Sequence, residues 1–367
     1  MPNYRAGVIG LGWMGLLYDL ADRIGGDYTI DDVDRPTPEL DVHRRFHHHE
    51  HPGKEMENET YSEALWDRPG VDLVAGCERD PRRLKAFGER YGIDALYTDS
   101  ADMLRSEKLD IVAIATNVKG RADLTCLAVE HGARAIFTEK PMCHTLEEAD
   151  RIVKACADAG VPINCGAITT THPSFARAKE LLAGGAIGDI LSMEALPPGS
   201  QHQNWSYFVD SKPAWVVGVG DRERPDVSGS TEFSGQGMMV TVDGQIVHFR
   251  TGGPLFRVTG SAGEMVHDWS PAGWRLWQHV DGLPPRQWVE MPWPGPQIVG
   301  SYGAFYALDD ILACLEGRLD EPKNSARRVA VALEIEIALK ESSARGGVRV
   351  DLPLSDRSLG LSYSSFR

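Results

Sequence analysis

The chain has 367 residues, more than one hydrophobic core of ordinary size needs, so we expect two domains. Hydrophobic residues make up 42% and charged residues 25%, a balance that excludes a disordered chain. The formal net charge of −15 argues against nucleic acid and anionic membranes as partners. Apolar runs such as 111–116 are far too short to cross a bilayer, no signal-peptide pattern is visible, and the six cysteines have no paired spacing. We therefore expect a cytoplasmic protein with reduced thiols.

Residues 5–15 read RAGVIGLGWMG, a short apolar strand that runs directly into a glycine-rich turn. In a strand–turn–helix unit the first glycine allows the tight turn, the second lets the backbone approach a pyrophosphate, and the third lets the helix pack on the strand. The pyrophosphate then binds the N–H groups at the start of the helix. We predict dinucleotide contacts from Gly10, Gly12, Trp13, Met14 and Gly15.

Apolar strands alternate with helical patterns through the following part of the chain. The spacing predicts strands at 72–77, 110–116, 135–138 and 163–167, and helices at 81–91, 121–131 and 146–160. Thr145 and Glu148 form a capping-box pattern at the start of the last helix. Short connections and strands that are apolar on both faces predict a parallel doubly wound α/β Rossmann sheet. We assign this domain to residues 1–142, with an insertion at about 27–59.

From Ile190 onward, strand patterns follow one another without intervening helices. The Asp243-Gly244 pair between two of them predicts a hairpin. Consecutive strands favour an antiparallel sheet, so we expect residues 143–367 to form an α+β domain that ends in helices at 302–316 and 325–342. The expected strands are 191–195, 214–218, 238–242, 245–250, 256–259 and 265–268.

The insertion is rich in proline, acid and histidine, and residues 43–51 read HRRFHHHEH. Histidines at this density allow a metal-binding interpretation. A solvated polar loop is the simpler interpretation, because no regular element fixes the ring geometry. We therefore predict no metal site.

Glu78 ends the second strand of the alternating part, where Rossmann domains place the acid that binds the adenosine ribose. Its carboxylate can accept both ribose hydroxyls. Arg79 follows directly and could instead pair with a 2′-phosphate. A carboxylate beside that phosphate would repel it, so the pair favours NAD and leaves NADP as an alternative.

Several segments together resemble the Gfo/Idh/MocA oxidoreductases. They are the glycine turn, CERDPRRLKAFGERYG, IVAIAT, the tripeptide Glu139-Lys140-Pro141 and, later, FARAKELLAGGAIGDI, FRVTGSAGEM and ARRVAVALEIEIALKES. The resemblance implies a Rossmann domain followed by an open-faced, mainly antiparallel sheet. It also implies an NAD(P)-dependent enzyme that oxidises a secondary hydroxyl of a sugar or cyclitol, or reduces the ketone. Homodimers or homotetramers are expected.

The resemblance further assigns residues to the reaction. It places Lys140 beside the nicotinamide as the acid/base, because oxidation of a carbinol also requires removal of the hydroxyl proton. Desolvation would lower the pKa of this lysine. Glu139 shapes the same turn, and Thr116 and Asn117 follow the neighbouring strand, so we expect all three near the cofactor.

His202 stands where the family has a histidine that relays the proton, whereas Pro198 replaces the usual aspartate. Arg121 replaces a family histidine and suggests an anionic substrate or cofactor contact, with capping of the next helix as the alternative. His172 could reach the substrate pocket or pack in the core. Trp205 is expected to line the substrate site, since indoles stack on sugar rings.

Two other functions stay open at this point. The missing aspartate allows an enzyme that uses bound NAD for a transient oxidation, which drives elimination or glycoside cleavage. A dinucleotide-binding regulator without turnover is the second alternative.

Overall fold

The computed structural model describes residues 3–17, 60–166, 169–196, 204–229, 231–269, 272–285, 287–297 and 304–362. The expected insertion at 27–59, with its histidines at 43–51, therefore lies outside the described residues, as do Pro198 and His202.

The first sheet is fully parallel, with strand order β3-β2-β1-β4-β5-β6. This order confirms the predicted doubly wound sheet, and it reverses between β1 and β4, where such sheets bind their ligands. Its strands are β1 (Tyr4–Ile9), β2 (Val71–Cys77), β3 (Ala95–Tyr97), β4 (Ile111–Ile114), β5 (Ala135–Thr138) and β6 (Ile163–Cys165).

Helices on both faces cover this sheet. The predicted capping box is present, since Glu148 N donates to Thr145 Oγ1 and Thr145 N donates to a Glu148 carboxylate oxygen. The short elements α3, α5 and β3 were not predicted from the sequence. The helical elements are η1 (Trp13–Leu17, a π-helical turn), α3 (Tyr61–Asp67), α4 (Pro81–Tyr91), α5 (Ser100–Glu107), α6 (Arg121–Glu130) and α7 (Leu146–Ala159).

The second sheet has strand order β14-β13-β12-β11-β7-β10-β9-β8-β15 and is antiparallel except where β10 pairs with β7. All six predicted strands are present, and Asp243-Gly244 joins β9 to β10 with Gly244 at φ +88°. Strands β13, β14 and β15 were not predicted. The bounds are β7 (Ile190–Ala195), β8 (Pro213–Val219), β9 (Gln236–Thr241), β10 (Ile246–Phe249), β11 (Phe256–Gly260), β12 (Gly263–Trp269), β13 (Ala272–His279), β14 (Trp288–Met291) and β15 (Val350–Asp351).

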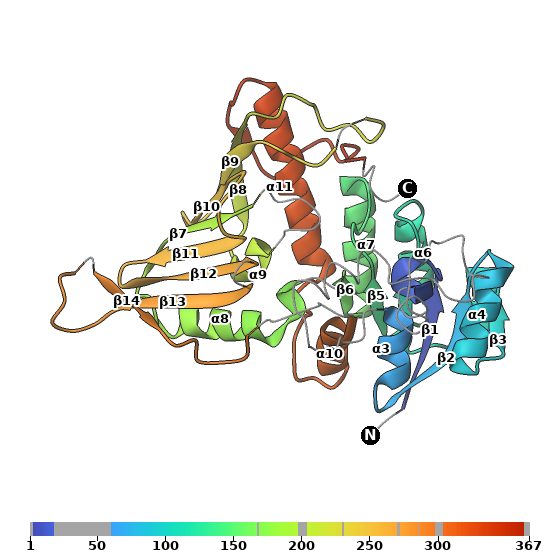
Figure 1. Cartoon of the computed structure of the whole chain (residues 1–367). Coiled ribbons are helices and arrows are strands. Elements are labelled where there is room, and N and C mark those ends of the chain that lie inside the picture. Colours follow the sequence, from blue (N-terminus) through green and yellow to red (C-terminus); the bar gives the residue numbers. More distant parts are fainter. Residues whose placement is uncertain are drawn as a thin grey trace.

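The long helix α11 (Ala326–Ala344) lies between the two sheets (Figure 1) and packs on β8 as well as on α7 and β6. The short helix α9 (Trp205–Phe208) packs on α11, and α8 (Pro173–Ala183) contributes to the core of the second sheet. Helix α10 (Ala304–Leu315) packs on α3 and β5. Strand β6 and helix α10 thus pack with the first sheet although both follow residue 142 in the chain, and the domain boundary itself stays a prediction.

Two expectations from composition can be compared with this structure. All six cysteines lie in the described residues and none forms a disulfide, which agrees with reduced thiols. Among the helices that the structure describes, none combines the length and apolarity needed to span a bilayer.

Candidate functional site

The glycine turn lies at the carboxyl edge of the parallel sheet, between the ends of β1 and β4. Gly10 has φ +91°, and a Cβ atom at this position would lie 2.9 Å from the main-chain nitrogen of Thr116. A Cβ atom on Gly15 would lie 2.0 Å from the carbonyl oxygen of Gly10. Both positions therefore require glycine, in agreement with the tight turn and the close helix packing that the motif predicts. Trp13 and Met14 are partly exposed at this edge.

Glu78 joins the end of β2 to the glycine turn. One carboxylate oxygen accepts a hydrogen bond from Leu11 N at 2.8 Å, and the other accepts from Arg79 N at 2.7 Å and Asp80 N at 3.1 Å. The side chain of Arg79 is exposed. The carboxylate thus lies beside the glycine turn, the position that a ribose-binding acid requires, and the ribose contact itself stays a prediction.

The Glu139-Lys140-Pro141 turn follows β5 at the same edge and is held by a buried carboxylate. Glu139 Oε2 accepts from Lys140 N at 2.9 Å, and Glu139 Oε1 accepts from the Tyr61 hydroxyl at 2.8 Å. Burial, reinforced by the Glu139 charge, raises the pKa of Tyr61 well above its usual value, so the phenol stays protonated and donates. Sequence reasoning missed Tyr61 because it follows the insertion and carries no motif.

The Lys140 side chain is half-buried, and burial lowers the pKa of its amine below the usual value. The positive charge of Arg121 acts in the same direction, whereas the carboxylates of Glu139 and Glu232 raise this pKa. Glu232 belongs to the loop that connects β8 to β9, so the second domain contributes a charge at Lys140. Glu232 was not predicted either, because its polar loop contains no recognisable pattern.

Arg121 begins α6 and is almost fully buried, with 3% of its surface exposed. Its guanidinium donates to the carbonyl oxygens of Glu139 (2.8 Å), Pro141 and Thr116. These main-chain partners occupy both Nη atoms of the guanidinium, whereas its buried Nε has no hydrogen-bond partner among the described residues, and a contact of Arg121 with an anionic substrate or cofactor stays a prediction. Thr116 and Asn117 lie at the edge of the site, where Asn117 is exposed.

Two expected substrate residues occupy packed positions. Trp205 is 1% exposed, and its indole meets the ring of Phe249 edge-on with centroids 5.6 Å apart. Its ring therefore fills the core of the second domain and does not line an open site. His172 caps α8, since its Nδ1 accepts from Ser174 N at 3.1 Å, and its ring contacts Tyr306. Of the two interpretations of His172, the structure favours the packed one.

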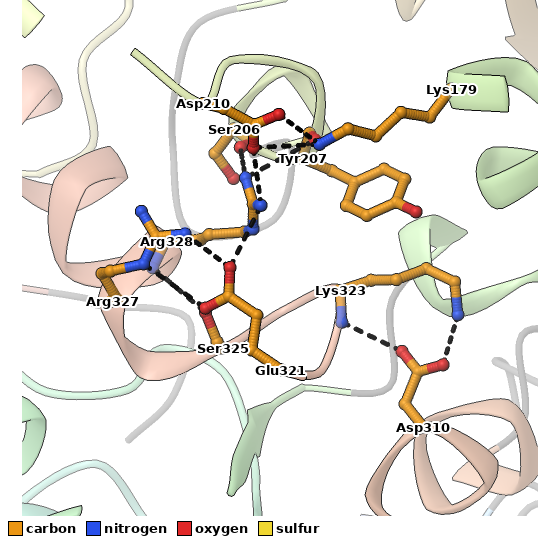
Figure 2. Close-up of polar contacts among 10 residues, drawn as sticks. All are labelled: Lys179, Ser206, Tyr207, Asp210, Asp310, Glu321, Lys323, Ser325, Arg327 and Arg328. Carbon is orange, nitrogen blue, oxygen red and sulfur yellow. Dashed lines mark hydrogen bonds and ion pairs between the residues drawn. The ribbon is translucent and has the colours of Figure 1, made fainter. Parts of the chain in front are cut away.

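Helix α9 follows the segment that contains His202 and is fixed to α11 by Arg328. Figure 2 shows this guanidinium among its partners, with Nη1 2.6 Å from the carbonyl oxygen of Ser206 and Nη2 2.9 Å from Asp210 Oδ1. Arg328 also pairs with Glu321 at 3.1 Å. This network anchors the chain beside the expected relay histidine, although the placement of His202 itself lies outside the described residues.

The same network reaches α8, and a separate ion pair lies near it (Figure 2). Lys179 on α8 donates to the carbonyl oxygen of Tyr207 at 2.8 Å and to Asp210 at 2.9 Å. In the separate pair, Lys323 binds Asp310 on α10, and its main-chain nitrogen donates to the same carboxylate at 3.0 Å. The network therefore ties α8, α9 and α11 together, and the separate pair fixes α10 to the segment before α11. In the part of the chain with described structure, no group of three or more His, Cys, Asp or Glu side chains could hold a metal ion.

One family model matches part of the first domain and the segment that follows it. Residues 53–167 match the family model described as "Oxidoreductase family, NAD-binding Rossmann fold". The chain is 40% identical to the D-apiose dehydrogenase of Paraburkholderia graminis over 122 residues, which is 33% of this chain and 32% of that protein. It is 31% identical to the NAD(+)-dependent scyllo-inositol 2-dehydrogenase of Bacillus subtilis over 122 residues, 33% of this chain and 35% of that protein. The matches thus span about a third of these relatives.

Solved structures resemble the whole fold. A levoglucosan dehydrogenase in complex with NADH and levoglucosan aligns with a TM-score of 0.64 over 96% of this chain and 100% of the other, at 19% identity. At this identity the likeness shows the fold alone. Residues 53–167, which include the Glu139-Lys140-Pro141 turn described above, are thus similar to the NAD-binding Rossmann domain of the Gfo/Idh/MocA oxidoreductases.

Proposed function

We propose that the protein is an NAD-dependent oxidoreductase that transfers a hydride between the nicotinamide and a secondary hydroxyl or ketone of a sugar or cyclitol. The observation that carries this proposal is the position of Lys140: a partly desolvated amine at the carboxyl edge of the parallel sheet, in a turn fixed by Glu139 and Arg121. The named activities of the D-apiose and scyllo-inositol dehydrogenases support the substrate class.

The chemistry follows from the state of the lysine. Oxidation of a carbinol releases a hydride from carbon and a proton from oxygen, and bound NAD supplies the hydride acceptor. The neutral amine of Lys140 takes the hydroxyl proton, and the ammonium returns it when a ketone is reduced. Burial favours the neutral amine by lowering its pKa, so the base form is present nearer to neutral pH than for an exposed lysine.

The residues around the glycine turn would hold the cofactor. The main-chain N–H groups of the turn from Gly10 to Gly15 would bind the pyrophosphate, Glu78 would accept the ribose hydroxyls, and Thr116 and Asn117 would border the nicotinamide. The carboxylate of Glu78 favours NAD, and the exposed Arg79 leaves NADP as the alternative. A relay through His202, a cytoplasmic location and a homo-oligomeric state are further parts of this proposal.

A substrate screen tests the reaction. D-apiose, scyllo-inositol, myo-inositol and levoglucosan are each incubated with the protein and NAD or NADP, and NADH or NADPH formation is followed by absorbance. We expect turnover with at least one sugar or cyclitol. Product formation without net NADH would instead support a transient oxidation, and cofactor binding without any turnover would support a regulator.

Substitution of the lysine tests its role. Lys140→Ala is expected to lower turnover roughly a hundredfold or more, because it removes the proton acceptor, while NAD affinity changes little. Lys154→Ala is the control and should keep the wild-type turnover, since Lys154 is an exposed lysine on α7 that pairs with Asp158. Full activity of the Lys140→Ala protein would remove this lysine from the mechanism.

A further inference from the structure

We propose that Arg121 is a positioning residue for Lys140: it clamps the main chain on both sides of this lysine and acts on its amine through a fixed positive charge. The inference rests on the proposed function only for the statement that Lys140 is the acid/base. Its geometry and its test concern the lysine itself.

The clamp is visible in the choice of partners. Nη1 of Arg121 donates to the carbonyl oxygen of Glu139, which precedes Lys140, and to that of Pro141, which follows it. Nη2 donates to the carbonyl oxygen of Thr116, at the end of the neighbouring strand. One rigid guanidinium therefore joins the ends of β4 and β5. A lysine at position 121 could not reproduce this, because an ammonium lacks the planar fork of donors.

A second set of contacts completes the fixation of the turn. Lys140 N donates to the carboxylate of Glu139, and the other oxygen of that carboxylate accepts from Tyr61. Glu139 N donates in turn to the carbonyl oxygen of Ile114 at 3.2 Å. The backbone around Lys140 is thus bonded on each side. The main chain that carries the Lys140 side chain is therefore fixed, as the precision of an acid/base residue requires.

The charge of Arg121 gives the clamp its second effect. Its hydrogen-bond partners at this site are neutral carbonyl groups, and the carboxylate of Glu139 is the charge that acts most strongly on it. A cation close to an amine disfavours the ammonium form. The charged groups that act on Lys140 are Arg121, which lowers its pKa in addition to burial, and Glu139 and Glu232, which raise it. The three elements that carry them are the start of α6, the turn after β5 and the β8–β9 loop.

Competitive labelling of the intact protein measures this effect without substrate or cofactor. Folded protein is treated with trace acetic anhydride over a series of buffers from roughly pH 6 to pH 11, which spans the titration range of lysine. Acetylation of Lys140 is then quantified by peptide mass spectrometry. For Arg121→Gln we expect the labelling midpoint to move to higher pH, with labelling near neutral pH reduced roughly threefold or more. For Glu232→Gln we expect the midpoint to move to lower pH, because a negative charge is removed.

Two further variants separate charge from geometry and from general damage. Arg121→Lys keeps the charge but loses the fork, so the midpoint should stay near that of the wild type while amide exchange in the peptide over 136–142 becomes faster. Arg328→Gln removes another buried arginine that also binds main-chain carbonyls, yet it does not act on Lys140. This control should leave the Lys140 midpoint unchanged.

The labelling midpoint of Arg121→Gln and the amide exchange of Arg121→Lys test the two parts of this inference. A folded Arg121→Gln protein whose midpoint is unchanged or moves to lower pH would overturn it. If this variant does not fold, Arg121→Lys decides, and unchanged amide exchange over 136–142 would then overturn the positioning role. An inactive protein that shows the expected shifts would refute the proposed function but leave this inference intact.

Discussion

Two buried arginines of this protein have opposite surroundings. Arg121, in the first domain, donates to the carbonyl oxygens of three main-chain groups at the ends of β4 and β5. Arg328, at the start of α11, donates to the main-chain carbonyls of Ser206 and Tyr207 at 2.6 and 3.5 Å, but it also pairs with carboxylates on two acidic side chains (Figure 2). Both are more than nine-tenths buried.

The two sets of partners give the two cations different roles. The charge of Arg328 is balanced by its own partners, so its contribution is to hold α9 on α11. Arg121 has only main-chain carbonyl groups as hydrogen-bond partners in the described residues, and its charge acts on the amine of Lys140 together with the opposing charges of Glu139 and Glu232. Glu336 on α11 is an acidic counterpart of Arg121, because its carboxylate accepts from the main-chain nitrogen of Phe233 at 2.7 Å.

The largest effect on stability is expected where the ion-paired arginine is removed. Arg328→Gln removes a buried guanidinium from two partly exposed carboxylates and from the carbonyl oxygen of Ser206, and should lower the free energy of unfolding by about 2 kcal/mol, measured by urea denaturation. Arg327→Gln is the matched control, since Arg327 also pairs with Glu321 but is about half exposed. It should cost less than about 1 kcal/mol. Equal losses of unfolding free energy in the two variants would show that the burial of Arg328 does not increase its contribution to stability.

The features of the first domain that depend on local sequence signals could be predicted. The glycine turn, the helix at 81–91 and the position of Glu78 follow from strand patterns, caps and spacing, and the structure places all of them at the predicted edge. Each of these signals lies within a few residues of the feature that it predicts. Strands β13 and β14 escaped prediction because tryptophans and prolines there obscure the alternation of apolar and polar residues.

The electrostatic surroundings of Lys140 could not be predicted in the same way. The partners of Arg121 lie 5 to 20 positions away in the chain and are carbonyl groups, which every residue possesses. Glu232 is 92 positions away from Lys140 in the chain, and its charge acts on this lysine only because the second domain brings the β8–β9 loop near it. Trp205 was expected at the substrate site because aromatic rings suit both sugars and cores, and only the packing against Phe249 distinguishes the two.

A smaller effect is expected at the carboxylate that supports Lys140. Tyr61→Phe removes the donor to Glu139 Oε1 inside the protein, so a buried acceptor loses its partner. The free energy of unfolding should fall by about 1 to 2 kcal/mol in urea denaturation. Tyr97→Phe is the control, because its hydroxyl bonds to Glu107 at 2.6 Å at a partly exposed site where water can replace it. A Tyr61→Phe protein as stable as the control would show that Glu139 finds another donor.

The smallest expected effect concerns the pH dependence at Glu336. Burial, with the charge of Glu232 as the next cause, raises the pKa of this carboxyl from 4.5 to about 8. Between these two values the unfolded chain has released the proton and the folded chain keeps it, so the free energy of unfolding falls as pH rises through this window. The stability that the protonated Glu336 carboxyl contributes is fully present at low pH, and it is lost once this group also ionises in the folded chain.

Glu336→Gln tests this sign, because glutamine can still accept from Phe233 N but cannot ionise. Between pH 6 and pH 7, which lie inside the window, the variant should lose about 1 kcal/mol less stability than the wild type. Glu290→Gln, on the exposed strand β14, should keep the wild-type dependence. Parallel curves for the wild type and Glu336→Gln would mean that Lys340, whose charge opposes the effect of burial, compensates it fully. In that case the buried carboxylate of Glu336, which accepts from a main-chain nitrogen, would behave like an ion-paired group. Glu336 would then no longer be an acidic counterpart of Arg121.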